Sequence, residues 1–397
     1  MRLWCVSLML VGGGALGTAP AGADCGGDFR DWLQGVRAEA QASGVGEAAV
    51  GLIAGVRENP KVLARDRSQQ VFSQDWQTFA GRMVNAFRLK SGRSYLKQLA
   101  GPFAAAQQAF GVPGPVIAAF WGLETDFGKV QGDFSTLDAL ATLAHDCRRP
   151  DLFRPQLLAA LALVDRGYLT PAQLTGAWAG ELGQIQLLPA DYLAFGTDGD
   201  GDGRVDLRSS AADVILTGAR FLQHLGWRAG EPWLEEVRIP DGLPWGQAGL
   251  AVPRRQWADW GVLAVSGAPL ADTDPSTAEL PASLLLPMGS KGPAFLTYPN
   301  FACIMRWNHS RVYATTVAYL ANRLAGAPAA QRGHPDPALS VEQLKQLQEA
   351  LLALGDDIGA ADGVLGTKTR EAVRREQLRR GLPADGWPTM ELLTARP

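Results

Sequence analysis

The stretch from Gly114 to Gly128 constrains the fold of this 397-residue chain more than any other. Ile117, Phe120 and Trp121 recur at helical spacing within it, which predicts a buried helix. Glu124 continues the same apolar stripe, because it follows these residues at helical intervals. A carboxyl group in that position loses water, which raises its pKa and suits it to act as a general acid. The alternative is an ordinary helix-end residue whose charge reaches solvent.

The composition is that of an ordinary globular protein. Apolar residues make up 47% of the chain and charged residues 19%. The length allows two or three domains with a sizeable core. The formal net charge of −3 provides no global basic field, so we expect no nucleic-acid partner.

The N-terminus has the pattern of an export signal. Arg2 precedes an apolar run over residues 3–16, and the small residues 21–23 form a cleavage pattern, so we expect a signal peptide over residues 1–23. The run is too short to span a bilayer comfortably, and no later stretch predicts a transmembrane anchor. Asp24 stands before Cys25 where lipidation needs a small residue, which favours a soluble protein in a periplasm.

Export to an oxidising compartment predicts a disulfide among the three remaining cysteines, Cys25, Cys147 and Cys303. The number is odd, so we expect one disulfide and one buried thiol. Cys303 lies in the strand-like apolar run 301–305 and is the better candidate for the core. A Cys25–Cys147 bond is therefore the favoured pairing.

Helical patterns dominate the first two thirds of the chain. Further helices are predicted near residues 28–44, 74–91, 95–110, 136–144, 153–166 and 211–225. From 228 to 299 the helical periodicity fades, and runs such as 261–267 and 283–288 suggest strands among long loops. A helical pattern returns over 310–324, and a Pro/Ala/Gly-rich linker follows over 326–338. Residues 339–397 predict a small three-helix module, which opens with a capping box between Ser340 and Gln343.

Two loops carry ligand-binding patterns. The segment 176–186 is glycine-spaced, which lets a backbone approach a ligand closely. The segment 198–206 resembles a calcium loop, with Gly203 at its sixth position but Ser209 where the bidentate Glu usually stands. Its candidate ligands for a structural Ca²⁺ are Asp198, Asp200, Asp202, Arg204 and Asp206. The alternative is a polar Asp-Gly turn without a metal.

Five blocks in order resemble the membrane-bound lytic murein transglycosylase B family, soluble members included. They are GLETDFG (122–128), LATLAHDCRRPDLF (140–153), GAWAGELGQIQLLPADY (176–192), the aspartate loop, and NFACIMRWNHSRVYATTVAYLA (300–321). The segment after the linker resembles a three-helix peptidoglycan-binding domain. The resemblance implies a mainly α protein, with a lysozyme-like catalytic domain over 24–325, an insertion over 228–299 that covers the cleft, and a peptidoglycan-binding domain over 339–397.

The resemblance also implies site residues. Glu124 matches the single essential glutamate of the family. The implied substrate-binding residues are Arg148, Arg149, Trp178, Gln186, Asn308 and Tyr313. For the two arginines the alternative is a solvated helix end, and for Gln186 and Tyr313 it is a satisfied buried polar group.

The implied activity is non-hydrolytic cleavage of the β-1,4 bond between N-acetylmuramic acid and N-acetylglucosamine, which leaves 1,6-anhydro ends and requires no cofactor. Conventional hydrolysis normally uses a second carboxylate. Asp126 lies two residues beyond Glu124 and would face away on a helix, and Asp133 is no better a partner, so a muramidase is less favoured. The implied partner is the glycan strand, and cell-wall synthesis or envelope machinery is a further expectation.

The chain departs from the family pattern at two positions in the glycine-spaced segment. Ala177 stands where a serine is usual, which removes a hydroxyl expected near the glutamate. Glu181 replaces a usual alanine and adds a charge near the cleft. These changes leave open a catalytically decayed peptidoglycan-binding protein.

Overall fold

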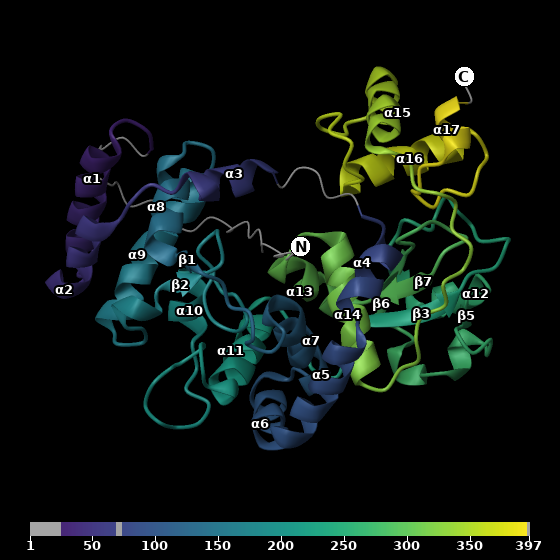
Figure 1. The fold of residues 1–397 in the computed structure, drawn as a ribbon. Coiled ribbons are helices and arrows are strands. Elements are labelled where there is room, and N and C mark those ends of the chain that lie inside the picture. The colour runs from purple at the N-terminus through teal and green to yellow at the C-terminus, as the bar shows by residue number, and fades with distance from the viewer. Residues whose placement is uncertain (1–24, 69–73, 395–397) are drawn as a thin grey trace. The chain divides into compact units, whose positions relative to one another are not determined.

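The computed structural model describes residues 25–68 and 74–394 (Figure 1). The chain divides into two compact units. The first is drawn from Met1–Gln69, Ala86–Trp227 and Arg306–His309, and the second from Gln70–Asn85, Arg228–Met305 and Ser310–Pro397. The predicted signal peptide lies outside the described residues. Within them, no helix is both long and apolar enough to cross a membrane.

The first unit is helical. It contains α1 (Phe29–Ala42), α2 (Glu47–Val50), α3 (Pro60–Ser68), α5 (Ala86–Gln98), α6 (Ala100–Phe110), α7 (Gly114–Thr125), α8 (Thr136–His145), α9 (Pro150–Asp165), α10 (Pro189–Phe195) and α11 (Ala211–His224). A two-stranded antiparallel ribbon joins β1 (Phe134–Ser135) to β2 (Thr175–Gly176), and η1 (Gly51–Gly55) and η3 (Pro171–Gln173) are 3₁₀ turns.

Helix α7 lies at the centre of this unit. It is buried on all sides, as expected for a helix that is apolar all round. Helices α5, α6 and α11 pack against it (Figure 1). The ring of Trp307 stacks on Phe120 with centroids 4.2 Å apart and meets Phe221 of α11 edge to face. The sequence prediction of a buried central helix is therefore confirmed.

The second unit contains a five-stranded antiparallel sheet in the order β4-β6-β7-β3-β5. Its strands are β3 (Leu234–Arg238), β4 (Val252–Pro253), β5 (Leu263–Ala264), β6 (Pro281–Leu285) and β7 (Ala294–Thr297). Helices α4 (Trp76–Met83), α12 (Arg254–Asp259), α13 (Pro299–Trp307) and α14 (Arg311–Leu324) and the turns η4 (Leu270–Asp272) and η5 (Pro275–Thr277) accompany it. The last two residues of α13 are grouped with the first unit. Trp257 and Leu296 are fully buried in the core of the sheet.

The same unit ends in three helices, α15 (Val341–Ala353), α16 (Thr367–Arg379) and α17 (Met390–Thr394). The predicted capping box of Ser340 and Gln343 opens α15. The buried side chain of Gln348 fixes the turn before α16, because its amide accepts from Gly363 N and donates to Val364 O and Thr369 Oγ1.

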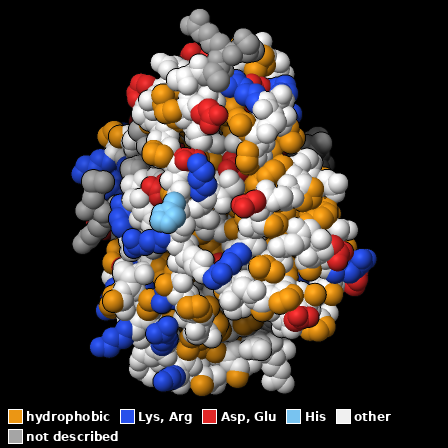
Figure 2. Space-filling view, turned by 90° about the vertical axis from the view of Figure 1, so that its right-hand side faces the viewer, with side chains coloured by type: hydrophobic (Ala, Val, Ile, Leu, Met, Phe, Trp, Pro, Cys, Tyr) orange, Lys and Arg blue, Asp and Glu red, His pale blue; other side chains and the backbone are white. Residues whose placement is uncertain are grey.

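On the face shown in Figure 2, acidic and basic side chains both occur, with hydrophobic side chains among them.

Three local predictions differ from the structure. The helix predicted over 74–91 is broken, because Val84 leaves helical geometry and Asn85 caps Arg82 O. The single helix predicted over 95–110 is divided at Leu99, which leaves helical geometry between the end of α5 and the start of α6. The strand-like run 301–305 is helical, within α13. A short apolar run fits a buried strand or a buried helix equally well, so periodicity alone could not decide.

The favoured disulfide is confirmed. Cys25 and Cys147 are bonded, with their Cα atoms 5.1 Å apart. The bond fixes the segment before α1 to the loop between α8 and α9 across 122 residues of sequence. Cys303 is a buried free thiol, as predicted.

Candidate active site

Glu124 lies in the last turn of α7. Its side chain is 9% exposed, so the carboxyl group is largely removed from water. The residues before it are apolar and buried, and Thr125, which ends the helix, is 1% exposed. A carboxyl group at the edge of an apolar helix can donate a proton to a bound group and later recover one.

The chain leaves α7 in an uncommon conformation. Asp126 and Phe127 both have positive φ angles, of 52° and 60°, although neither is glycine. Such a conformation costs roughly 1–2 kcal/mol per residue, and it is found most often at functional sites. Arg88 offsets part of this cost, because its guanidinium pairs with Asp126 at 2.8 Å and donates to Gly122 O. Asp126 therefore lies just outside the helix, and its carboxylate is paired with Arg88.

Gln184 holds the glycine-spaced segment against the end of α7. Its side-chain oxygen accepts from Trp121 Nε1 at 2.8 Å, and its backbone oxygen accepts from the Thr125 hydroxyl. Gly128 has φ of 84°, and a Cβ there would lie 2.2 Å from Gln184 Oε1. The sequence analysis missed Gln184. Its position two residues before Gln186, in a recognised block, was the available signal.

Three glycines of the segment 176–186 are required by close packing within the protein, and the predicted approach of this backbone to a ligand stays a prediction. A Cβ on Gly180 would lie 2.3 Å from Leu140, and one on Gly183 would lie 2.8 Å from Leu207. A Cβ on Gly176 would lie 2.0 Å from the backbone oxygen of Glu181. These glycines let the segment pack closely against the rest of its own unit.

Glu181 is the most unusual carboxyl group near this segment. It is 2% exposed, and neither oxygen has a hydrogen-bond partner. Burial raises its pKa to about 7, although the nearby amides of Glu181 and Ala179 and the charge of Arg149 act in the opposite direction. The sequence analysis noted the charge but not its burial, since local pattern does not reveal which side of a loop faces the core.

Arg148 and Arg149 converge on a buried carboxylate that the sequence analysis did not select. Both guanidinium groups pair with Asp66 of α3, which is 2% exposed. The Arg149 guanidinium also lies 5.0 Å above the ring of Phe153, while its Nε has no hydrogen-bond partner. The arginine pair is therefore anchored to the protein rather than free at a solvated helix end.

Gln186 and Trp178 are both buried, at 4% and 2% exposure. Gln186 has a φ of 51°, and its amide nitrogen donates to Gly183 O and Gln131 O. Its nitrogen thus helps to shape the loop. Trp178 offers little exposed surface in this structure, so its stacking on a sugar ring stays a prediction, as does substrate binding by Gln186.

Asn308 and Tyr313 lie in different units. Asn308 is 3% exposed and directly follows Trp307, whose ring stacks on Phe120 one turn before Glu124. Tyr313 is 1% exposed in α14, which belongs to the second unit. The predicted place of Tyr313 in the cleft stays a prediction.

The aspartate loop gathers three of its predicted ligands. Oxygen atoms of Asp198, Asp200 and Asp202 lie within 4.8 Å of one another. The Asp206 carboxylate instead accepts from the backbone of Arg208 and Ser209 and caps the next turn. Three convergent carboxylates fit a hard cation such as Ca²⁺, and Arg204 could add only its carbonyl oxygen.

Asp213 supports this loop from α11 and was missed by the sequence analysis. It is 1% exposed, and its carboxylate accepts from Gly199 N at 2.8 Å and from Asp206 N at 2.6 Å. Burial raises its pKa, although these two amides act in the opposite direction. An acidic residue in the first turn of the helix after the loop was the signal that could have indicated it.

Comparisons with known proteins identify relatives of both parts of the chain. Residues 28–322 match the family described as Transglycosylase SLT domain, and residues 340–395 match a peptidoglycan binding domain. Membrane-bound lytic murein transglycosylase B of Escherichia coli (strain K12) is 29% identical over 252 residues, which cover 63% of this chain and 67% of that protein.

Two solved structures extend the likeness. SltB3 from Pseudomonas aeruginosa, in complex with NAG-anhNAM-pentapeptide, has a TM-score of 0.85 and 36% identity, over 93% of this chain and 99% of that chain. Soluble lytic transglycosylase SltB1 from the same organism has a TM-score of 0.65 and 26% identity, over 74% of this chain and 98% of that chain.

Proposed function

Because this chain belongs to the Transglycosylase SLT domain family, with a lysozyme-like, mainly helical fold and a peptidoglycan-binding domain, we propose that it cleaves murein without water. The bond cut is the β-1,4 link between N-acetylmuramic acid and N-acetylglucosamine, and the product carries a 1,6-anhydro end. The observation that carries this proposal is the buried carboxyl group of Glu124 at the end of a fully apolar helix.

Glu124 acts twice in the proposed reaction. The protonated carboxyl first gives its proton to the glycosidic oxygen as the bond from that oxygen to C1 breaks. The carboxylate then takes the proton from the C6 hydroxyl of the muramyl residue as that oxygen bonds to C1. Glu124 ends the reaction with a proton, as it began. The reaction therefore consumes no water and needs no second carboxylate.

The proposed wall-binding domain keeps the catalytic domain close to its substrate. We assign a signal peptide to residues 1–23, the catalytic domain to 24–325 with the insertion 228–299 over its cleft, the linker to 326–338 and the wall-binding domain to 339–397. Tethering raises the concentration of the catalytic domain at its polymer without changing the chemistry. A periplasmic location follows from this assignment and from a substrate found there. Contact with cell-wall synthesis or envelope machinery stays a prediction.

Mass spectrometry of purified murein digested with the mature chain tests the proposed reaction. We expect fragments that end in anhydro-muramic acid, each lighter by one water than a reducing end. Reducing ends would instead show hydrolysis, and Glu181→Gln would then be the first variant to examine for the second carboxyl group. Murein that is bound but uncut would contradict the proposal and indicate a wall-binding protein.

We also propose that the aspartate loop holds a structural Ca²⁺. Asp198, Asp200 and Asp202 would supply the carboxylates, and the Arg204 carbonyl a further oxygen. Ser209 replaces the usual bidentate Glu, so the affinity should be modest. The ion would stiffen the connection between α10 and α11 and would take no part in bond cleavage.

Thermal unfolding in calcium and in a chelator tests the metal site. Calcium at ten times its dissociation constant should add about 1.4 kcal/mol to the free energy of unfolding. Asp200→Asn should remove most of this gain, whereas Asp241→Asn, in the second unit, should preserve it. An identical melting temperature with calcium and with chelator, up to millimolar calcium, would contradict the site.

A further inference from the structure

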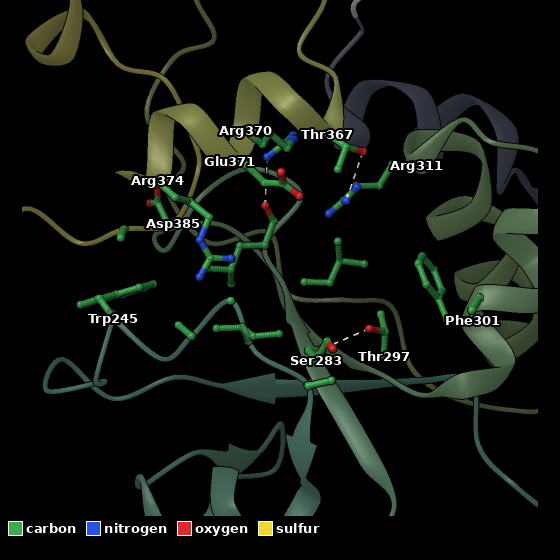
Figure 3. Close-up of a pocket in the computed structure, with 18 of the residues that line it drawn as sticks. Trp245, Ser283, Thr297, Phe301, Arg311, Thr367, Arg370, Glu371, Arg374 and Asp385 are labelled. Carbon is green, nitrogen blue, oxygen red and sulfur yellow. Dashed lines mark hydrogen bonds between the residues drawn. The ribbon is translucent and has the colours of Figure 1, made fainter. Parts of the chain in front are cut away.

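A cavity of about 800 Å³ lies within the second unit, between the sheet and α16. Residues of β6 and the loop around Trp245 line one side, and the arginines of α16 line the other. Arg311, at the start of α14, reaches into the space from the side opposite Arg374 (Figure 3). The volume falls in the range of sites that hold small ligands.

Positive charge in this cavity exceeds what the protein neutralises. Arg311, Arg370 and Arg374 make no ion pair within 4.0 Å among the described residues, whereas Arg375 pairs with Asp356. Arg370 donates instead to the carbonyl oxygens of Leu286 and Pro287. Three guanidinium groups therefore share one space without a paired carboxylate.

The two acidic residues of the cavity, Asp385 and Glu371, offset only part of this charge, because two carboxylates face three guanidinium groups without forming an ion pair with any of them. Asp385 is saturated, since its oxygens accept from the amide and hydroxyl of Ser290, from Gln377 Nε2 and from Trp387 N. Glu371 is exposed and makes no ion pair within 4.0 Å in the part of the chain that the structure describes. An anion that enters the cavity would meet Arg374, which donates no hydrogen bond to the described residues, and Arg311, whose bond to Thr367 Oγ1 is long at 3.5 Å.

The arginines also repel one another. Burial lowers the pKa of Arg370 to about 10, and the charge of Arg311 acts in the same direction. Burial lowers the pKa of Arg374 too; the charge of Asp385 acts in the opposite direction, and the charge of Arg311 adds to the lowering. A bound carboxylate would relieve this repulsion, and a guanidinium can bind one through two parallel hydrogen bonds.

We propose that this cavity binds a short peptide with free carboxylates, of the kind that peptidoglycan carries as stem peptides. Arg311 and Arg374 take the carboxylates, and the apolar side chains of Trp245 and Phe301 contact the small aliphatic side chains. The inference rests on the proposed action on murein, because murein is the polymer that carries such peptides. It adds a second contact with the polymer, separate from the scissile bond.

The site can be tested by calorimetry with the full mature chain and a free pentapeptide stem that lacks sugars. We expect binding with one peptide per chain, and none for the same peptide with its carboxylates amidated. Arg374→Gln and Arg311→Gln should each weaken binding about tenfold or more, because each removes a charge-assisted contact. Arg370 is avoided as a variant because it joins α16 to the sheet.

Lys368→Gln is the matched control, since it removes one positive charge from the same helix outside the cavity. It should leave binding within twofold, and melting curves should show that all variants fold. Equal binding by the Arg311→Gln/Arg374→Gln double variant would overturn the proposal, as would the absence of binding to the unaltered chain at millimolar peptide. If either of these two results were obtained and the murein digest still contained anhydro ends, the cavity assignment would be wrong and the proposed reaction would stand.

Discussion

Glu124→Gln lowers the release of soluble fragments from murein by at least about a thousandfold. Glutamine keeps the shape of the side chain but can neither give a proton to the glycosidic oxygen nor take one from the C6 hydroxyl. Both proposed steps therefore lose their catalyst at once. The substitution also replaces a buried carboxyl with a neutral group of the same size, so we expect the fold to persist. Chromatography of fragments from labelled murein measures the rate.

Asp133→Asn is the matched control for this variant. Asp133 is also close to Glu124 in sequence, but its side chain is exposed. The control should keep the rate within about twofold of the unaltered chain. A comparable loss in both variants would indicate a two-carboxylate mechanism, and an active Glu124→Gln variant would remove Glu124 from the reaction.

Glu181 makes the stability of the chain decrease as the pH rises from about 5 to 8. Its pKa is about 7 in the folded chain, compared with 4.5 for an unperturbed glutamate. Between these values the folded state holds a proton that the unfolded state has lost, so stability falls as pH rises and the loss is complete above pH 7. The difference corresponds to about 3 kcal/mol at pH 8 relative to pH 4.5.

Glu181→Gln should remove this dependence, because a neutral amide does not titrate. We expect the variant to gain stability relative to the unaltered chain at pH 8, and to differ from it much less at pH 5. Other buried acids, such as Asp191 and Asp213, titrate in both proteins and cancel in the comparison. Urea unfolding followed by tryptophan fluorescence at the two pH values supplies the measurement. Parallel pH profiles would show that Glu181 reaches water.

The pH profile also bears on how Glu181 affects the nearby Arg149. A carboxyl group with a pKa of about 7 and no hydrogen-bond partner changes charge near neutral pH. Arg149 is the nearby cation that favours the charged form. Deprotonation would therefore add a negative charge beside the arginine pair that Asp66 already holds.

Much of the fold could be predicted from local sequence. The stripe of Ile117, Phe120 and Trp121 predicted a buried helix, and the structure contains it as α7. The capping box of Ser340 and Gln343 predicted where α15 begins. Such features depend on residues within one or two helical turns, so their physical causes are present in the sequence itself.

The run 301–305 shows the limit of local reasoning. Its five residues are apolar enough for a buried strand, but they lie in α13. The backbone dihedrals there depend on what packs around the segment, and the nearby Trp307 packs against Phe120 and Phe221. Tertiary contacts override the weak preference of a short run.

The sequence by itself determined the helical class and a carboxyl group on an apolar helix, and it favoured the Cys25–Cys147 pairing that the structure contains. Only the tertiary structure decided that Asp66 pairs with both arginines, that Glu181 is buried without a hydrogen-bond partner, and that arginines from α14 and α16 share one cavity. The physical reason is distance along the chain. Asp66 and Arg149 are more than 80 residues apart, and no local periodicity encodes a contact that exists only after the helices between them have packed.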